Sequence, residues 1–195
     1  MLACHVTIIH GCEGPSNTIT CAEASGLLCM GEGMRVIQRD AADLCFTGGC
    51  ESKVNLMGAL RWTLLNRLAP CAETDSPDSI VRPFDPGAKG TVLGEGGGLV
   101  VLEEREKAVA RGASIYAEVA GFGAAHSPPP AYEEIRTKQS LSNDDQPGDG
   151  VRFAVEAALA DAGIAAGDID AIVPTGSGIR EEDVQEAAGL RAVFG

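Results

Sequence analysis

Apolar and polar positions along the chain switch between the period of a strand and that of a helix. A β-branched run predicts a short strand at residues 17–22, between Gly-Pro-Ser and a group of small residues. From Ala24 to about Gln38, apolar positions recur at helical spacing and predict a helix with one buried face. The expected face consists of Leu27, Met30, Gly31, Met34 and Ile37. The stretch "TITCAEASGLL" at 18–28 is therefore strand, sharp turn and helix start, an arrangement in which many enzymes hold a nucleophile.

The same alternation continues to the end of the chain. Strands are predicted within 40–49, 94–104, 114–124 and 168–178. The strand within 40–49 is buried and stops at paired glycines, and the strand within 94–104 follows a flexible glycine stretch. Helices are predicted at 56–68, 103–112, 151–162 and 181–194. Residues 71–90 and 125–149 are expected to be surface loops. Strands that alternate with helices predict an α/β sheet with parallel pairings.

Several local motifs carry little functional information. The glycines at 94, 96 and 98 precede a predicted strand, whereas a dinucleotide-binding loop follows a strand and opens a helix. The chain has no GxSxG elbow, and its three histidines have no ligand spacing, which favours structural or surface roles for His5, His10 and His126. Asp183 and Glu186 share a helix face, and such a pair alone is typical of a solvated edge.

Composition and charge narrow the classes of function. Hydrophobic residues make up 45% of the chain but aromatic ones only 4%, so the core is expected to consist of aliphatic side chains in a layered α/β structure. The net charge of −13 argues against nucleic acid or an anionic membrane surface as a partner. It also disfavours docking of an acidic carrier protein, unless Arg and Lys cluster locally.

The cysteines and the absence of targeting signals indicate a cytoplasmic protein. No apolar run approaches membrane-spanning length, and the N-terminal residues lack the features of a signal peptide. The seven cysteines form no CxxC pair or metal-ligand spacing, so we expect reduced, mostly buried thiols and neither a metal nor a cofactor.

Four stretches together resemble the β-ketoacyl-(acyl-carrier-protein) synthases, condensing enzymes of the thiolase-like fold. They are "GPSNTITCAEASG", "RVIQRDAADLCFTGGCES", "VRPFDPGAKGTVLGEGGGLVVLEEREKAVARGASIYAEVAGFGA" and "DIDAIVPTGSG…EEDVQEAAGLRAVFG", in the order that the family has them. The resemblance implies a layered α/β/α fold, incomplete at both ends. It assigns 1–112 to part of the N-terminal half, with the nucleophile elbow, and 113–195 to a linking strand and loop and the start of the C-terminal half.

The resemblance also implies where the catalytic positions lie. In the family, the Cys that takes the acyl group is the tenth residue counted from the Gly of Gly-Pro-Ser, and here that residue is Glu23. Cys21 lies two residues earlier, inside the predicted strand, as a buried thiol. The first catalytic His of the family corresponds to Thr175 in "TGS". The second His and the active-site Lys would lie beyond Gly195.

Two such replacements are hard to reconcile with condensation. A carboxylate forms no stable thioester, and Thr175 is not an imidazole base. The hypothesis is a non-condensing homologue in fatty-acid or polyketide biosynthesis, similar in logic to the chain-length factors that pair with an active ketosynthase, although those usually have Gln at this position. An acyltransferase or decarboxylase with altered chemistry, using Cys21, and a truncated relic stay open as alternatives.

The family resemblance suggests partners and a pocket as well. The expected partners are a Cys-containing ketosynthase subunit or a second copy of the chain, with acyl carrier protein bound indirectly or weakly. Four residues fall in segments that lie near the acyl pocket of the family: Phe84, Gly94, Glu95 and Gly96. Ordinary turn chemistry and packing are equally compatible with these segments.

Overall fold

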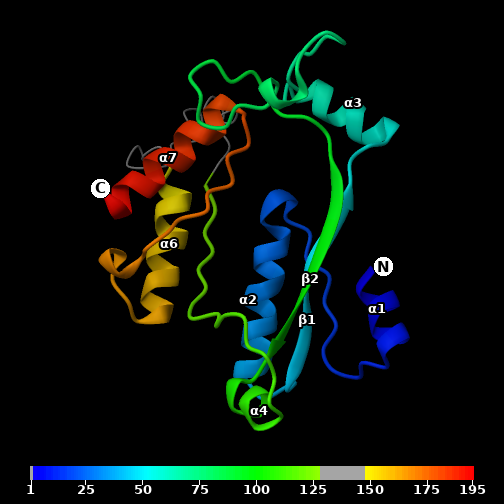
Figure 1. Cartoon of the computed structure of the whole chain (residues 1–195), viewed down its shortest axis with the longest axis vertical. Helices are drawn as coiled ribbons and strands as arrows, with labels where there is room; N and C mark the ends of the chain where they lie inside the picture. The colour runs from blue at the N-terminus through cyan, green and yellow to red at the C-terminus, as the bar shows by residue number, and fades with distance from the viewer. Residues whose placement is uncertain (1, 128–147) are drawn as a thin grey trace, which may run out of the picture. The chain divides into compact units, whose positions relative to one another are not determined.

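The computed structural model describes residues 2–127 and 148–195 (Figure 1). Its helices are α1 (Leu2–His10), α2 (Ser25–Gln38), α3 (Leu56–Leu64), α4 (Arg105–Ala110), α6 (Asp149–Ala162) and α7 (Arg180–Phe194). Its strands are β1 (Leu44–Ser52) and β2 (Glu95–Glu103). The described residues of 1–52 and 95–120 form one compact unit, and those of 53–94 and 121–195 form a second.

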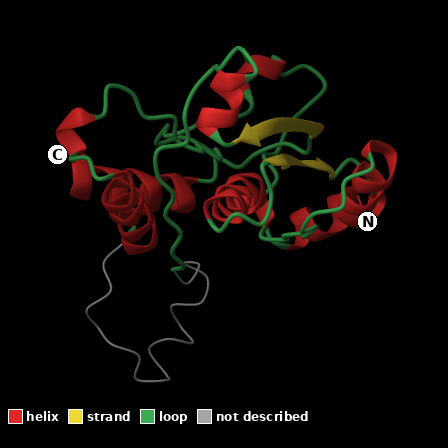
Figure 2. Ribbon diagram, turned by 90° about the horizontal axis from the view of Figure 1, so that it is seen from below, coloured by secondary structure: helices red, strands yellow, loops and turns green. Residues whose placement is uncertain are grey.

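In the first unit, β1 and β2 lie side by side as an antiparallel pair (Figure 2). Leu44 is opposite Glu103 at one end and Ser52 is opposite Glu95 at the other. The predicted parallel pairing is therefore wrong for these strands; the one parallel contact among the described residues is an isolated bridge between Leu68 and Thr91. Alternation of strands with helices does not fix strand direction when a long connection with its own helix intervenes.

The strand ends also differ from the prediction, because both strands include glycine-rich residues that the sequence placed at or outside their ends. β1 continues past its paired glycines to Ser52, and β2 already begins at Glu95, so Gly96 is part of a strand and not of a flexible loop. Gly97 shows why small residues suit this ribbon, because a Cβ there would lie 2.6 Å from the Cβ of Cys50 on β1. The glycines thus let the two backbones pair where side chains would collide.

Helix α2 packs against β1 through a close approach at Gly33. A Cβ at Gly33 would lie 2.3 Å from Cγ2 of Thr47, which is itself buried. The buried face of α2 consists of Gly31, Gly33, Met34 and Val36. The predicted face was therefore only partly right, since the side chain of Leu27 is 69% exposed. Because Gly33 has no side chain, β1 can approach α2 closely on that side of the helix.

Three predicted strands are not strands in this structure. The segments at 17–22, 114–124 and 168–178 form no ladder with any other described segment. Their sequences favour extended backbone, but a β-strand also requires a neighbour that supplies hydrogen bonds.

The cysteine thiols are more exposed than predicted. None of the cysteines is buried, and only Cys29 and Cys45 are half-buried.

In the second unit, α6 packs against α7 and the turn before α6 contacts the middle of α7. A Cβ at Gly148 would lie 2.4 Å from the backbone nitrogen of Gly189, so neither position has room for a side chain. Helix α3 ends at Leu64, four residues earlier than predicted, because Asn66 adopts the left-handed φ of +53°. The predicted loop at 125–149 lies mostly outside the described residues.

Candidate functional site

The turn that precedes α2 is held by the hydroxyl of Ser25. The backbone N–H of Cys21 donates to Ser25 Oγ at 2.7 Å, and the Ser25 hydroxyl donates to the carbonyl oxygen of Ala22 at 2.8 Å. Ala22 adopts a φ of +46°, in the left-handed region that an L-residue rarely occupies. Such strain persists only where surrounding contacts enforce it, and it is common at functional sites.

Glu23 lies in the next position of this turn. It is exposed, and it forms the middle of a single 3₁₀ turn, Ala22–Ala24, that runs directly into α2. A carboxylate at the start of a helix is favoured by the helix dipole and by N–H groups of the first turn, by about 0.3–1 kcal/mol. The sharp turn into a helix that the sequence predicted is present, with Glu23 at its bend.

Cys21 is placed differently from the prediction. It is exposed and belongs to no strand; it is the residue that immediately precedes the 3₁₀ turn. The sequence placed Cys21 in a strand because Thr18 to Thr20 are rich in β-branched side chains, but the Ser25 hydroxyl binds the N–H of Cys21 instead of a neighbouring strand.

Thr175 lies in the second unit, in a loop bound by a carboxylate of α7. The backbone N–H groups of Thr175 and Gly176 donate to the two carboxylate oxygens of Glu186, at 2.7 and 2.9 Å. Gly176 has a φ of +57°, which turns both N–H groups toward the same acceptor. The Thr175 side chain is exposed, while its backbone is fixed by α7.

Asp183, one turn before Glu186 on α7, is buried and connects three segments. Only 3% of its surface is exposed. Its carboxylate accepts hydrogen bonds from the Phe84 N–H at 2.8 Å, the Ser177 hydroxyl at 3.1 Å and the Gly178 N–H at 3.2 Å. The prediction of a solvated edge for Asp183 and Glu186 is therefore wrong, because both carboxylates bind the loop at 175–178.

Phe84 is held in an unusual backbone conformation next to this loop. Its φ is +60°, and its N–H is bound by Asp183. A Cβ at Gly176 would lie 2.9 Å from Cβ of Pro83 and 3.1 Å from Cε2 of Phe84. The structure thus brings Phe84 and the Thr175 loop together within the second unit. The sequence places Phe84 in a pocket segment of the family but contains no local sign of its buried acceptor, Asp183.

The other predicted pocket residues belong to the glycine-rich start of β2. Gly94 comes before the strand and belongs to the second unit. Glu95 and Gly96 are the first residues of β2 and belong to the first unit, which also contains the Glu23 turn. Glu95 accepts a hydrogen bond from the Ser52 hydroxyl at 2.7 Å. A Cβ at Gly94 or Gly96 would meet nothing within 4 Å, so neither glycine is required by local packing.

The remaining candidate chemistry is sparse. Within residues 2–127 and 148–195 there is no group of three or more His, Cys, Asp or Glu side chains that could hold a metal ion. His10 packs against the ring of Phe46, with centroids 5.2 Å apart. Across the part of the chain that the structure describes, none of the helices is long and apolar enough to cross a membrane.

Comparison with known proteins places the whole chain in one family of sequences. The N-terminal domain of β-ketoacyl synthases matches residues 1–108, and the C-terminal domain matches residues 131–195. The chain is 34% identical, over its full length, to 3-oxoacyl-[acyl-carrier-protein] synthase 2 of Vibrio cholerae serotype O1. It spans 44% of the length of that relative.

Two solved structures resemble the chain closely. One is a type II polyketide synthase acyl-carrier protein in complex with its ketosynthase bound to the hexaketide; the similarity has a TM-score of 0.85 at 27% identity and covers 99% of this chain and 45% of the other. The second is the ishigamide ketosynthase/chain length factor, with a TM-score of 0.73, 31% identity and coverage of 92% and 40%. The fold is the thiolase-like fold of these ketosynthases, and the chain belongs to the β-ketoacyl synthase family.

Proposed function

We propose that this chain is a non-condensing member of the β-ketoacyl synthase family, with a role like that of a chain-length factor in fatty-acid or polyketide biosynthesis. The observation that carries the proposal is Glu23 at the bend of the turn into α2. An acyl group transferred to a carboxylate would form an anhydride, which water hydrolyses. The negative charge of the Glu23 carboxylate also lies at the helix start, whose N–H groups and positive dipole end would otherwise stabilise a substrate oxyanion.

The loop at Thr175 supports the same proposal from the second unit. A hydroxyl does not replace an imidazole as a base at neutral pH. The two N–H groups of Thr175 and Gly176, which would be suitable donors to a developing negative charge, are already bound by Glu186. Loss of the nucleophile and of the base, in a chain that keeps the family fold, favours a role as a partner.

The proposed partner is a ketosynthase subunit that carries the Cys nucleophile. Similarity to the ishigamide ketosynthase/chain length factor supports this choice. A carrier protein would then contact the Cys-containing subunit, and this chain would contribute to the cavity for the growing acyl chain. A homodimer is the alternative assembly.

Co-expression with a Cys-containing ketosynthase from the same genome tests the proposal. We expect the two proteins to co-elute in size-exclusion chromatography and the mixture to condense malonyl- and acyl-carrier substrates. The chain alone, and its Glu23→Cys variant, should show no condensation, because Thr175 supplies no imidazole. Condensation by the unmodified chain alone would contradict the proposal, as would the absence of binding to the ketosynthase at micromolar concentration.

A second candidate, acyl transfer through Cys21, is favoured by the exposure of that thiol beside the turn. The Cys21 thiolate would attack a thioester carbonyl and release the carrier thiol. Incubation with an acyl thioester should then add one acyl mass at Cys21, and Cys21→Ser should remove it. Cys45 is an internal control, because burial raises the pKa of its thiol. Label spread evenly over the exposed cysteines would exclude this candidate.

A further inference from the structure

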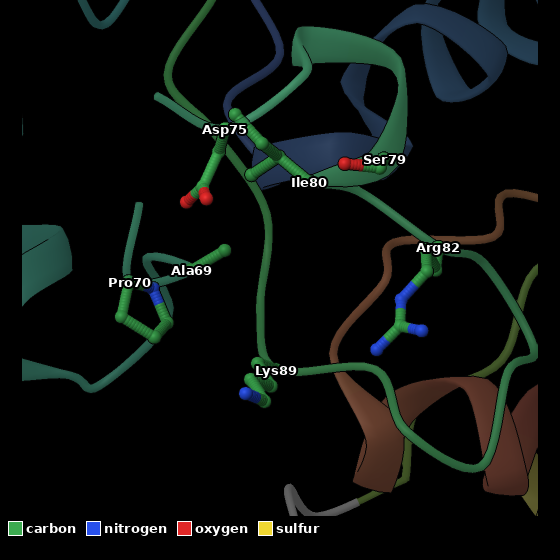
Figure 3. Close-up of a pocket in the computed structure, with 7 residues that line it drawn as sticks. All are labelled: Ala69, Pro70, Asp75, Ser79, Ile80, Arg82 and Lys89. Carbon is green, nitrogen blue, oxygen red and sulfur yellow. The ribbon is translucent and has the colours of Figure 1, made fainter. Parts of the chain in front are cut away.

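A polar hollow of about 180 Å³ lies within the second unit, between the loop after α3 and the segment that leads to Gly90 (Figure 3). Its lining residues are Ala69, Pro70, Asp75, Ser79, Ile80, Arg82 and Lys89. The polar atoms of Asp75 and Ser79 lie along one side of the hollow and the cationic groups of Arg82 and Lys89 along the other (Figure 3). All of these residues belong to the second unit.

The cationic side offers hydrogen-bond donors. Lys89 is exposed and makes no ion pair or hydrogen bond with any residue that the structure describes. This is notable in a chain with 28 acidic and 15 basic side chains, where acidic partners are abundant. Arg82 donates to the carbonyl oxygen of Gly87 and lies 3.6 Å from a carboxylate oxygen of Asp85. A guanidinium has five N–H donors, so Arg82 keeps donors for a ligand.

The opposite side offers acceptors. The hydroxyl of Ser79 already donates its hydrogen to the carbonyl oxygen of Ser76 at 2.8 Å, so toward a ligand Ser79 can only accept. The Asp75 carboxylate accepts the N–H of Ala72 at 2.8 Å through Oδ2 and retains lone pairs on both oxygens. An anion with no donor of its own would be attracted by Lys89 and repelled by Asp75.

We propose that this hollow binds a small polar molecule that carries an anionic group and, a few bonds away, a hydroxyl or N–H donor. The anionic group would bind Arg82 and Lys89, and the donor would bind Asp75 and Ser79. Matching both sides distinguishes such a ligand from an anion without a hydrogen-bond donor, which binds only the cationic side. The proposal does not depend on the role proposed for Glu23 and Thr175, which lie outside the hollow.

Calorimetric titration of the full chain with three matched probes tests two-sided binding. Glycerol 3-phosphate has an anion and hydroxyl donors, methyl phosphate has the anion without those hydroxyls, and glycerol has the hydroxyls without the anion. We expect glycerol 3-phosphate to bind at least about fivefold more tightly than methyl phosphate, and glycerol to show no saturable binding in the same range. Equal affinity for the two phosphates, or no saturable binding of either, would overturn the proposal.

Three variants connect the binding to this hollow. Lys89→Gln should weaken glycerol 3-phosphate binding by about tenfold, because it removes the unpaired cation. Asp75→Asn should tighten methyl phosphate binding and narrow the difference between the two phosphates. Lys107→Gln is the matched control, since it removes the same charge from the first unit, where Lys107 pairs with Asp43. A loss with Lys107→Gln equal to that with Lys89→Gln would indicate general charge attraction and overturn the proposal.

Discussion

Asp183→Ala is expected to destabilise the second unit by about 3 kcal/mol, one of the two largest effects that this structure predicts. The buried carboxylate is the acceptor for the N–H groups of Phe84 and Gly178 and for the Ser177 hydroxyl. Alanine would leave the buried Gly178 N–H and the two part-buried donors without this acceptor, and the loss of an acceptor for a buried donor costs about 1–3 kcal/mol. Phe84, at a φ of +60°, would also lose the contact that holds its backbone.

Hydrogen exchange by mass spectrometry measures this loss where it arises. Asp183→Ala should speed exchange in peptides that cover 81–90 and 175–189 and lower the midpoint of urea unfolding. Glu181→Ala is the matched control, because Glu181 is an exposed acid in the same first turn of α7. If both variants exchanged equally fast, the effect would come from the helix dipole and not from the buried hydrogen bonds.

Local sequence signals located most helices well because their ends are determined by nearby residues. Helix α6 lies between Gly148 and Gly163, which flank it in left-handed conformations that glycine adopts readily. Helix α4 begins where the Glu104 carboxylate accepts the N–H of Lys107 at 2.8 Å. The N–H groups of Glu106 and Lys107 lower the pKa of Glu104, as expected for a capping carboxylate. These interactions span only a few residues, so their pattern is legible in the sequence.

Strands were predicted less well, since their existence depends on distant partners. The sequence favoured extended backbone at 114–124, yet the structure gives that segment no strand partner among the described residues. The direction of β1 relative to β2 depends on the path of the connection at 53–94, which joins the two strands. Hydrophobic periodicity contains no information about that path. For the same reason, the rotation of α2 about its axis became clear only from the contact of Gly33 with Thr47.

In the candidate site, too, the sequence located a residue with local signals and missed one whose partner is distant in the chain. Spacing from Gly-Pro-Ser identified Glu23 as the residue of interest, and the structure has the predicted turn there, but the assignment of Glu23 to the nucleophile position stays a prediction. Asp183 was taken for a surface residue because its partner Phe84 lies 99 positions away. A buried carboxylate that binds backbone N–H groups has no local signature, so sequence spacing alone could not identify it.

Gly123→Ala is the second variant for which we expect a large effect. A Cβ at Gly123 would lie 2.1 Å from the carbonyl oxygen of Ala154 and 2.5 Å from the backbone nitrogen of Ala158, both in α6. These are helix backbone atoms, which cannot move aside as the end of a flexible side chain can. The neighbouring Phe122 N–H is bound to a carboxylate oxygen of Asp161 at 2.9 Å, which limits any shift of the segment away from the helix.

We therefore expect Gly123→Ala to destabilise the second unit by about 2–3 kcal/mol, within the range of overpacking in a close contact. For a chain of this size the loss corresponds to a fall in Tm of about 5–10 °C, measurable by circular dichroism. Gly167→Ala is the control, because a Cβ at Gly167 would meet nothing within 4 Å, and its Tm should stay within about 2 °C of the parent. An unchanged Tm in Gly123→Ala would mean that the segment at 121–123 does not rest on α6 in solution, since no rearrangement of side chains alone could make room for the methyl group.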